Sequence, residues 1–179
     1  VSNRSGVLEI EGVSAETLAN RFGTPLYVYS AQTIRRRYQA LESAFKKREV
    51  LLCYALKANS NSTVCSVLVE QGAGADIVSI GELTRALRAG FTPDKIVFSG
   101  VGKTDEEMVA GLRAGLLTFN IESSEELDAL SRVAARLKIR APISIRLNPD
   151  VNAGTHPHIT TGRAENKFGV DTNEAMALY

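Results

Sequence analysis

The sequence predicts an α/β fold made of repeated strand and helix units, and two observations lead to this prediction. Short apolar runs alternate with segments of helical spacing through most of the chain. The unit recurs every roughly 20 to 25 residues, a length that suits a β-strand and its crossover helix. The repeat is compatible with a (β/α)8 TIM-type barrel or with an open doubly wound sheet, and periodicity alone does not choose between them.

The predicted strands are rich in Val, Ile, Leu and Phe, which is typical of strands buried on both faces of a parallel sheet. They cover residues 50–56, 75–79, 95–99, 117–121 and 142–147. The predicted helices between them cover residues 63–71, 81–88, 105–114 and 124–137. Ahead of these units we expect a short strand over 26–29 and a basic amphipathic helix over 31–48, packed outside the sheet. Its basic residues are interpreted as a solvated face, namely Arg35, Arg36 and Arg37.

Capping signals support several helix boundaries. Capping-box spacing joins Thr104 to Glu107, Ser123 to Glu126 and Asp171 to Glu174, and glycine follows three helices at Gly72, Gly90 and Gly115. A complete eight-unit barrel needs about 250 residues. The chain has 179 residues and ends inside a helix that begins near Thr172, so we expect an incomplete barrel of about five units.

Composition favours a small-molecule ligand over other partners. The chain is 44% hydrophobic and 23% charged with a formal net charge of +1, and its charges are mixed, so no basic stripe indicates nucleic acid. Runs of about 20 apolar residues, as a membrane span requires, are absent from the sequence. We therefore expect no membrane partner and a cytoplasmic location. Cys53 and Cys65 lie in apolar stretches and are interpreted as reduced, buried thiols.

Lys57 follows the first apolar strand of the repeat, at the end where parallel barrels build their active sites. Burial at such a position disfavours the ammonium and frees the amine for a Schiff base. Taken alone, this feature favours the interpretation of Lys57 as an ordinary solvated lysine.

The segment from Ser99 to Thr104 contains Gly102-Lys103-Thr104 and invites comparison with a phosphate-binding loop. A Walker motif needs a glycine five residues before the Gly-Lys-Thr, and Val97 occupies that position inside a strand. Thr104 is therefore interpreted as a helix cap.

His156 and His158 are the only histidines, and a pair at this spacing could in principle bind a metal. No third ligand is evident in the sequence, so we expect no metal and interpret the long segment 148–166 as structural or substrate-lining. Asp76 and Arg146 are charged residues within apolar strands, which is costly unless they are paired or serve a site. Glu82 and Lys167 have ordinary alternatives as cap or loop charges.

Four ordered motifs carry a resemblance to a known family. They cover residues 54–59, 74–79, 96–104 and 146–151, inside a match that runs from 23–29 to 167–170. Together they resemble the barrel domain of the fold-type III pyridoxal-phosphate-dependent decarboxylases, whose barrel is of the alanine racemase kind. One position departs from the pattern, since Ile80 stands where many relatives have glycine.

The resemblance implies pyridoxal 5'-phosphate as cofactor and Lys57 as the lysine that anchors it. It further implies that Ala55, Asp76 and Arg146 lie around the cofactor. Residues implied to support the pocket are Glu82, Lys167 and His158. Residues 1–30 would belong with a second domain, and residues 31–179 would form the partial barrel.

The substrate is indicated by residues 152–162, which most resemble the enzymes that decarboxylate meso-2,6-diaminopimelate to L-lysine. Ornithine and arginine decarboxylases are more distant relatives and stay an alternative, as does a non-catalytic carrier of the cofactor. Relatives place further site residues beyond position 179 and donate some of them across a homodimer. We therefore expect the isolated 179 residues to be inactive.

Overall fold

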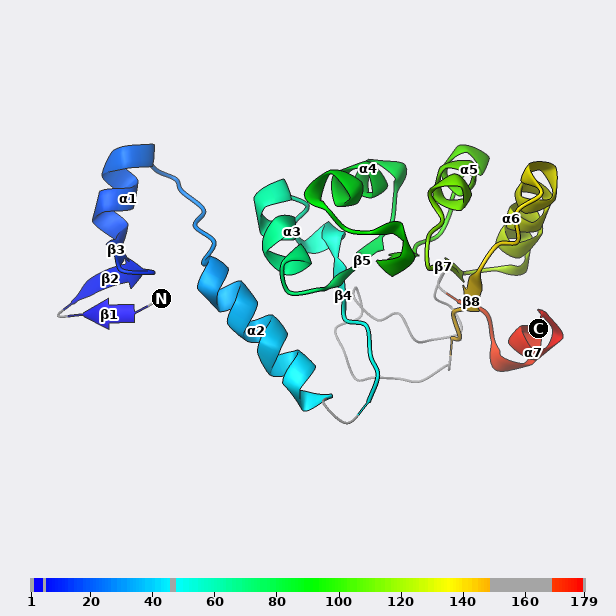
Figure 1. The fold of residues 1–179 in the computed structure, drawn as a ribbon, viewed down its shortest axis with the longest axis horizontal. Helices are drawn as coiled ribbons and strands as arrows, with labels where there is room; N and C mark the ends of the chain where they lie inside the picture. Colours follow the sequence, from blue (N-terminus) through cyan, green and yellow to red (C-terminus); the bar gives the residue numbers. More distant parts are fainter. Residues whose placement is uncertain (1, 5, 46–47, 149–168, 179) are drawn as a thin grey trace.

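The computed structural model describes residues 2–4, 6–45, 48–148 and 169–178 (Figure 1). The chain begins with three short antiparallel strands and a helix, which lie apart from the rest and lead through an extended segment into a second helix. These elements are β1 (Ser2–Arg4), β2 (Val7–Ile10), β3 (Val13–Ser14), α1 (Ala15–Phe22) and α2 (Ala31–Ala44). Among the described residues, every helix is too short or too polar to cross a membrane.

The main body is a five-stranded sheet in which all neighbouring strands are parallel and the order is β4-β5-β6-β7-β8. The strands are β4 (Cys53–Ala55), β5 (Gly74–Ile77), β6 (Ile96–Phe98), β7 (Thr118–Ile121) and β8 (Ile143–Ile145). The helices between them are α3 (Ser62–Val69), α4 (Ile80–Ala89), α5 (Asp105–Ala114) and α6 (Ser124–Leu137). A last helix, α7, covers Thr172–Leu178.

The strand order decides between the two architectures that the repeat allowed. A doubly wound sheet reverses its strand order at a switch point and carries helices on both faces. Here the strands follow the order of the chain, and α3, α4, α5 and α6 lie in a row along one side of the sheet (Figure 1). The expected incomplete barrel is confirmed. Beyond β8, Leu147 forms a parallel bridge with Val170, so the sheet continues toward a sixth strand.

The core lies between the sheet and this row of helices. Strand residues such as Ile77, Phe98 and Phe119 are fully buried, and the rings of the two phenylalanines stack with centroids 5.8 Å apart. Helix residues Met108 and Leu130 are 1% exposed and close the other side. Burying such side chains contributes roughly 1.5 to 3 kcal/mol each, which is the main force holding the units together.

Two expectations about local structure were wrong, and three short strands were not predicted. Residues 26–29 are not a strand, because the segment is extended without a partner strand among the described residues. The helix expected over 31–48 ends at Ala44, because the following N–H, that of Phe45, donates to the carbonyls of Glu42 and Ser43. Strands β1 to β3 were not predicted, since two to four residues are too few to show a period.

Glu107 links two helix starts. The Thr104 Oγ1 accepts from the Glu107 N–H, and the Glu107 carboxylate accepts from Thr104 N, so the predicted capping box is complete. The other carboxylate oxygen accepts from Ile80 N at 2.9 Å, which ties α4 to α5.

Ile80 itself is 44% exposed, and the side chain that departs from the family pattern therefore disturbs no packing.

Gly74 should tolerate no side chain. A Cβ at this position would lie 2.5 Å from the Lys95 carbonyl oxygen and 2.7 Å from the Cys53 Sγ. The Lys95 carbonyl belongs to the backbone directly before β6, which cannot move aside without disturbing that strand. We expect Gly74→Ala to cost about 2 kcal/mol and to lower the melting temperature of the full-length protein by roughly 4 to 8 °C. Gly81→Ala is the matched control, because its nearest neighbour would be the Ser79 Oγ at 3.7 Å. Equal melting temperatures for both variants would contradict the packing described.

The Glu107 link should depend on pH. Burial raises the pKa of the Glu107 carboxyl, but hydrogen bonds from Thr104 and Ile80 more than offset this, and the pKa lies below its ordinary 4.5. A lowered pKa in the fold means stability that is present above pH 4.5 and lost as the pH falls through the lowered value. Glu107→Gln keeps only one acceptor oxygen, so it should cost about 1 kcal/mol at pH 7. The difference in melting temperature from wild type should close in acid. Glu106→Gln, at the exposed neighbour, is the control and should cost less than about 0.5 kcal/mol at pH 7.

Candidate active site

A polar pocket of about 640 Å³ lies where the five parallel strands end. Each strand supplies at least one polar side chain to it or to its rim, because the carboxyl ends of parallel neighbours meet at one edge. The lining residues are Lys57, Asp76, Val78, Ser99, Gly100, Val101, Asn120, Glu122 and Arg146. Three of the residues singled out from the sequence, Lys57, Asp76 and Arg146, are thus brought together.

Lys57 lies in a single 3-10 turn, Leu56–Ala58, directly after β4. Leu56 is fully buried and anchors this turn, while Lys57 borders the pocket. The side chain of Lys57 is exposed in the described chain, so the partial desolvation that its place after a strand allows is not seen here. The reason is that β4 is the outer strand of the sheet and has no strand on its other side among the described residues.

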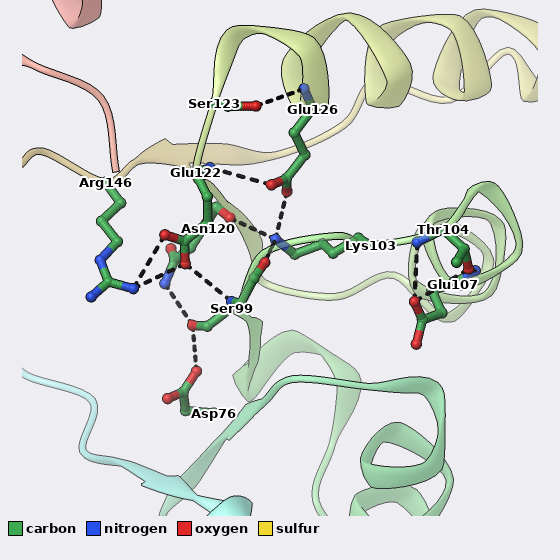
Figure 2. A network of polar contacts seen from close by, with 11 residues as sticks. Asp76, Ser99, Lys103, Thr104, Glu107, Asn120, Glu122, Ser123, Glu126 and Arg146 are labelled. Carbon is green, nitrogen blue, oxygen red and sulfur yellow. Dashed lines mark hydrogen bonds and ion pairs between the residues drawn. The ribbon is translucent and has the colours of Figure 1, made fainter. Parts of the chain in front are cut away.

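Asp76 is held by a chain of hydrogen bonds that crosses three strands (Figure 2). The Ser99 Oγ donates to Asp76 Oδ1 at 2.5 Å, and the Asn120 Nδ2 donates to the Ser99 Oγ at 2.9 Å. The three residues stand on or directly after β5, β6 and β7, so sheet pairing places them in line. This chain fixes the carboxylate of Asp76 at the floor of the pocket.

Glu122 is a site residue that sequence reasoning missed. Its side chain is 1% exposed and accepts from Arg146 Nη1 at 3.0 and 3.2 Å, and from Gly100 N at 3.1 Å (Figure 2). The side chain of Arg146 is 41% exposed and lines the pocket. Glu122 directly follows β7, much as Lys57 follows β4, and this position after a strand is the sequence feature that could have predicted it. The adjacent Ser123 has capping-box spacing to Glu126, so the same segment was interpreted only as a helix start.

Other predicted site residues stand close to the pocket or outside the described chain. Ala55 pairs with Asp76 in the register of β4 and β5, although it is not part of the pocket lining. Glu82 Oε2 accepts from Val78 N at 2.8 Å, so it holds the loop that follows β5. Lys167 and His158 lie outside the described residues, as does His156.

The two cysteines are poor nucleophiles in this fold. Burial raises the pKa of both the Cys53 and Cys65 thiols, with the charge of Asp76 adding to the effect at Cys53. Both are free thiols, as expected, but only Cys65 is buried, whereas Cys53 is partly exposed. Within the described ranges, no three His, Cys, Asp or Glu side chains gather closely enough to bind a metal ion.

Comparison with known proteins agrees with this geometry. The chain is 53% identical over 178 residues to the diaminopimelate decarboxylase of Pseudomonas aeruginosa, covering 99% of this chain and 43% of that protein. The solved diaminopimelate decarboxylase of Helicobacter pylori, complexed with L-lysine, matches with a TM-score of 0.89 and 48% identity over 92% of this chain and 42% of that one. The corresponding enzyme of M. jannaschii, also in complex with L-lysine, matches with a TM-score of 0.91 and 40% identity over 99% and 43%.

The chain thus spans about two fifths of the length of the curated relatives it matches. Residues 31–179 match the family described as "Pyridoxal-dependent decarboxylase, pyridoxal binding domain". The chain belongs to this family of pyridoxal-dependent decarboxylases.

Proposed function

We propose that the full-length protein decarboxylates meso-2,6-diaminopimelate to L-lysine and carbon dioxide, with pyridoxal 5'-phosphate bound at Lys57. The observation that carries the proposal is the pocket at the strand ends, which combines an accessible lysine with a fixed acid and a fixed guanidinium. Family membership and diaminopimelate decarboxylase relatives at about 50% identity support it.

The residues present fit a pyridoxal group. Lys57 would hold it through its side-chain amine, while Asp76 and Arg146 would face it from the neighbouring strands. When bound, pyridoxal phosphate supplies an aldehyde that captures amines and a ring that accepts the electrons released when carbon dioxide departs. The pocket lining carries two cationic and two acidic side chains, so an anionic cofactor would meet no net repulsion.

The surrounding residues keep these groups in place. Ser99 donates to Asp76, which leaves the second carboxylate oxygen for a ligand, and Glu122 holds Arg146 from behind. A fixed charge needs no reorganisation when a ligand binds, and this favours both affinity and orientation. Ala55 beside Asp76 leaves room near the site, and Glu82 supports the loop at Val78. We extend the supporting role to Lys167 and His158.

We further propose the division into residues 1–30, which belong with a second domain, and a barrel domain over 31–179. The family match begins at residue 31, and the first elements lie apart from the sheet (Figure 1). Phe22 and Tyr27 are 62% and 86% exposed, an apolar surface that a second domain would cover.

The full-length protein is proposed to be a cytoplasmic homodimer. The 179 residues alone are proposed to be inactive, because the family resemblance implies further site residues beyond position 179.

The role of Lys57 can be tested in the full-length protein. Borohydride reduction in the presence of pyridoxal phosphate, followed by peptide mapping, should place the modification on Lys57. Lys57→Ala should abolish the visible absorption of the bound cofactor, whereas Lys95→Ala, at the opposite end of the sheet, should retain it. Persistence of the band in Lys57→Ala, or a label on another lysine, would refute the assignment.

The substrate can be tested by turnover of three amino acids. We expect kcat/KM for meso-2,6-diaminopimelate to exceed that for ornithine and for arginine by at least about a hundredfold, since a site that pairs polar groups rejects substrates lacking them. The isolated 179-residue chain is the negative control. Preferred turnover of ornithine or arginine would assign the protein to that branch. Bound cofactor without turnover of any of the three would instead indicate a carrier.

A further inference from the structure

The polar network behind the pocket contains a lysine that the proposed chemistry does not use. Lys103 belongs to the Gly-Lys-Thr segment, which lacks the glycine of a phosphate loop. Its side chain is 2% exposed, and its Nζ donates to Gly100 O at 2.7 Å, Asn120 O at 2.8 Å and Glu126 Oε1 at 2.5 Å (Figure 2). An ammonium has three donors, and all three are used within the protein.

Stability alone does not account for this arrangement. Of the ion pairs in the part of the chain that the structure describes, only Lys103–Glu126 has both side chains nearly removed from solvent, at 2% and 8% exposure. Burying two charges costs several kcal/mol for each ion, and an apolar pair of similar volume is often at least as stable. The pair therefore needs an explanation other than stability. Its contacts support one, namely that the pair holds the neighbouring pocket residues in fixed positions.

The acceptors of Lys103 belong to residues that build the pocket. Gly100 accepts through its carbonyl and donates its N–H to Glu122, which holds Arg146. Asn120 likewise accepts through its carbonyl, while its side-chain amide donates to Ser99. One ammonium is thus joined to both hydrogen-bonded chains, the one that ends on Arg146 and the one that ends on Asp76.

Glu126 attaches this centre to the helix layer. One oxygen of its carboxylate accepts from Lys103, and the other lies 3.4 Å from the Glu122 N–H that donates to it. Its own N–H donates to the Ser123 Oγ, which begins α6. The start of α6, the end of β7 and the loop after β6 therefore meet at a single ion pair.

We propose that Lys103, with Glu126 as its counter-ion, is a positioning residue of the pyridoxal phosphate site: it touches no ligand and sets the places of Asp76 and Arg146 through Asn120 and Gly100. This inference rests on the proposed function. A purely structural lysine would be replaceable by any side chain that restores stability, whereas a positioning lysine would not.

The test compares Lys103→Met with the double variant Lys103→Met/Glu126→Met in the full-length protein. The double variant removes both charges together and leaves no unpaired buried charge, so the cofactor-free protein should melt closer to wild type than the Lys103→Met protein does. It leaves the carbonyls of Gly100 and Asn120 without their shared donor. We expect the Kd for pyridoxal phosphate to rise at least about tenfold in both variants. The pH at which the visible band of the bound cofactor titrates should also shift.

Lys95→Met is the matched control. Lys95 stands at the other end of β6, where its Nζ lies 3.4 Å from the Gly72 carbonyl, so the same substitution there should leave cofactor affinity and band titration unchanged. A double variant that binds within about twofold of wild type, with unchanged titration, would overturn the positioning role.

Two further outcomes are decisive. If the double variant does not fold, Lys103→Gln, whose shorter amide cannot reach all three acceptors, is judged by the same affinity and titration. If neither variant folds, Lys103 is a folding determinant and the proposal fails. Absence of any visible band in wild type would defeat the proposed function and this inference with it, whereas a normal wild-type band beside unchanged variants defeats this inference alone.

Discussion

Parallel pairing of successive strands is the constraint on which the site depends. Each crossover runs from the carboxyl end of one strand to the amino end of the next, so all strands point the same way and their carboxyl ends lie together. The handedness of the crossovers keeps the helices on one side of the sheet. Residues as distant in sequence as Lys57 and Arg146 therefore border one pocket. The chemistry is located by the sheet before any single residue is considered.

Charge burial then decides which groups can occupy that edge. A buried carboxylate or ammonium is tolerated only when its hydrogen-bonding capacity is met. Glu122 meets this condition with Arg146 and the Gly100 N–H, and Lys103 meets it with two carbonyls and Glu126. Several of these hydrogen-bond partners are backbone atoms that lie in a strand or in the loop directly after it, so the pairing of the strands helps to set their positions. Backbone geometry thus carries over into the electrostatics of the pocket.

The sequence was most informative where a local signal and a long apolar run agreed. The bounds of α5 and α6 were predicted to the residue, because each has a Ser or Thr cap at its start and a regular apolar face. Lys57, Asp76 and Arg146, which border one pocket in the structure, were predicted as site residues from position and family motifs. Glu122 and Lys103 were not, because their roles depend on partners more than 15 residues away in the chain. No periodicity encodes such contacts.

Three helix starts show the limit of local prediction. In α4, α5 and α6 the cap hydroxyl accepts from the N–H of a glutamate three residues later, through Ser79, Thr104 and Ser123. The carboxylates of the three glutamates, however, bind different partners.

The carboxylate of Glu82 accepts from Val78 N, that of Glu107 joins two helices, and that of Glu126 pairs with Lys103. The hydroxyl contact is local and can be read from spacing, but the destination of the carboxylate is set by whatever the neighbouring unit presents. Because these helices begin just after the strands end, the rule that starts a helix also delivers an acid to the edge where the pocket forms.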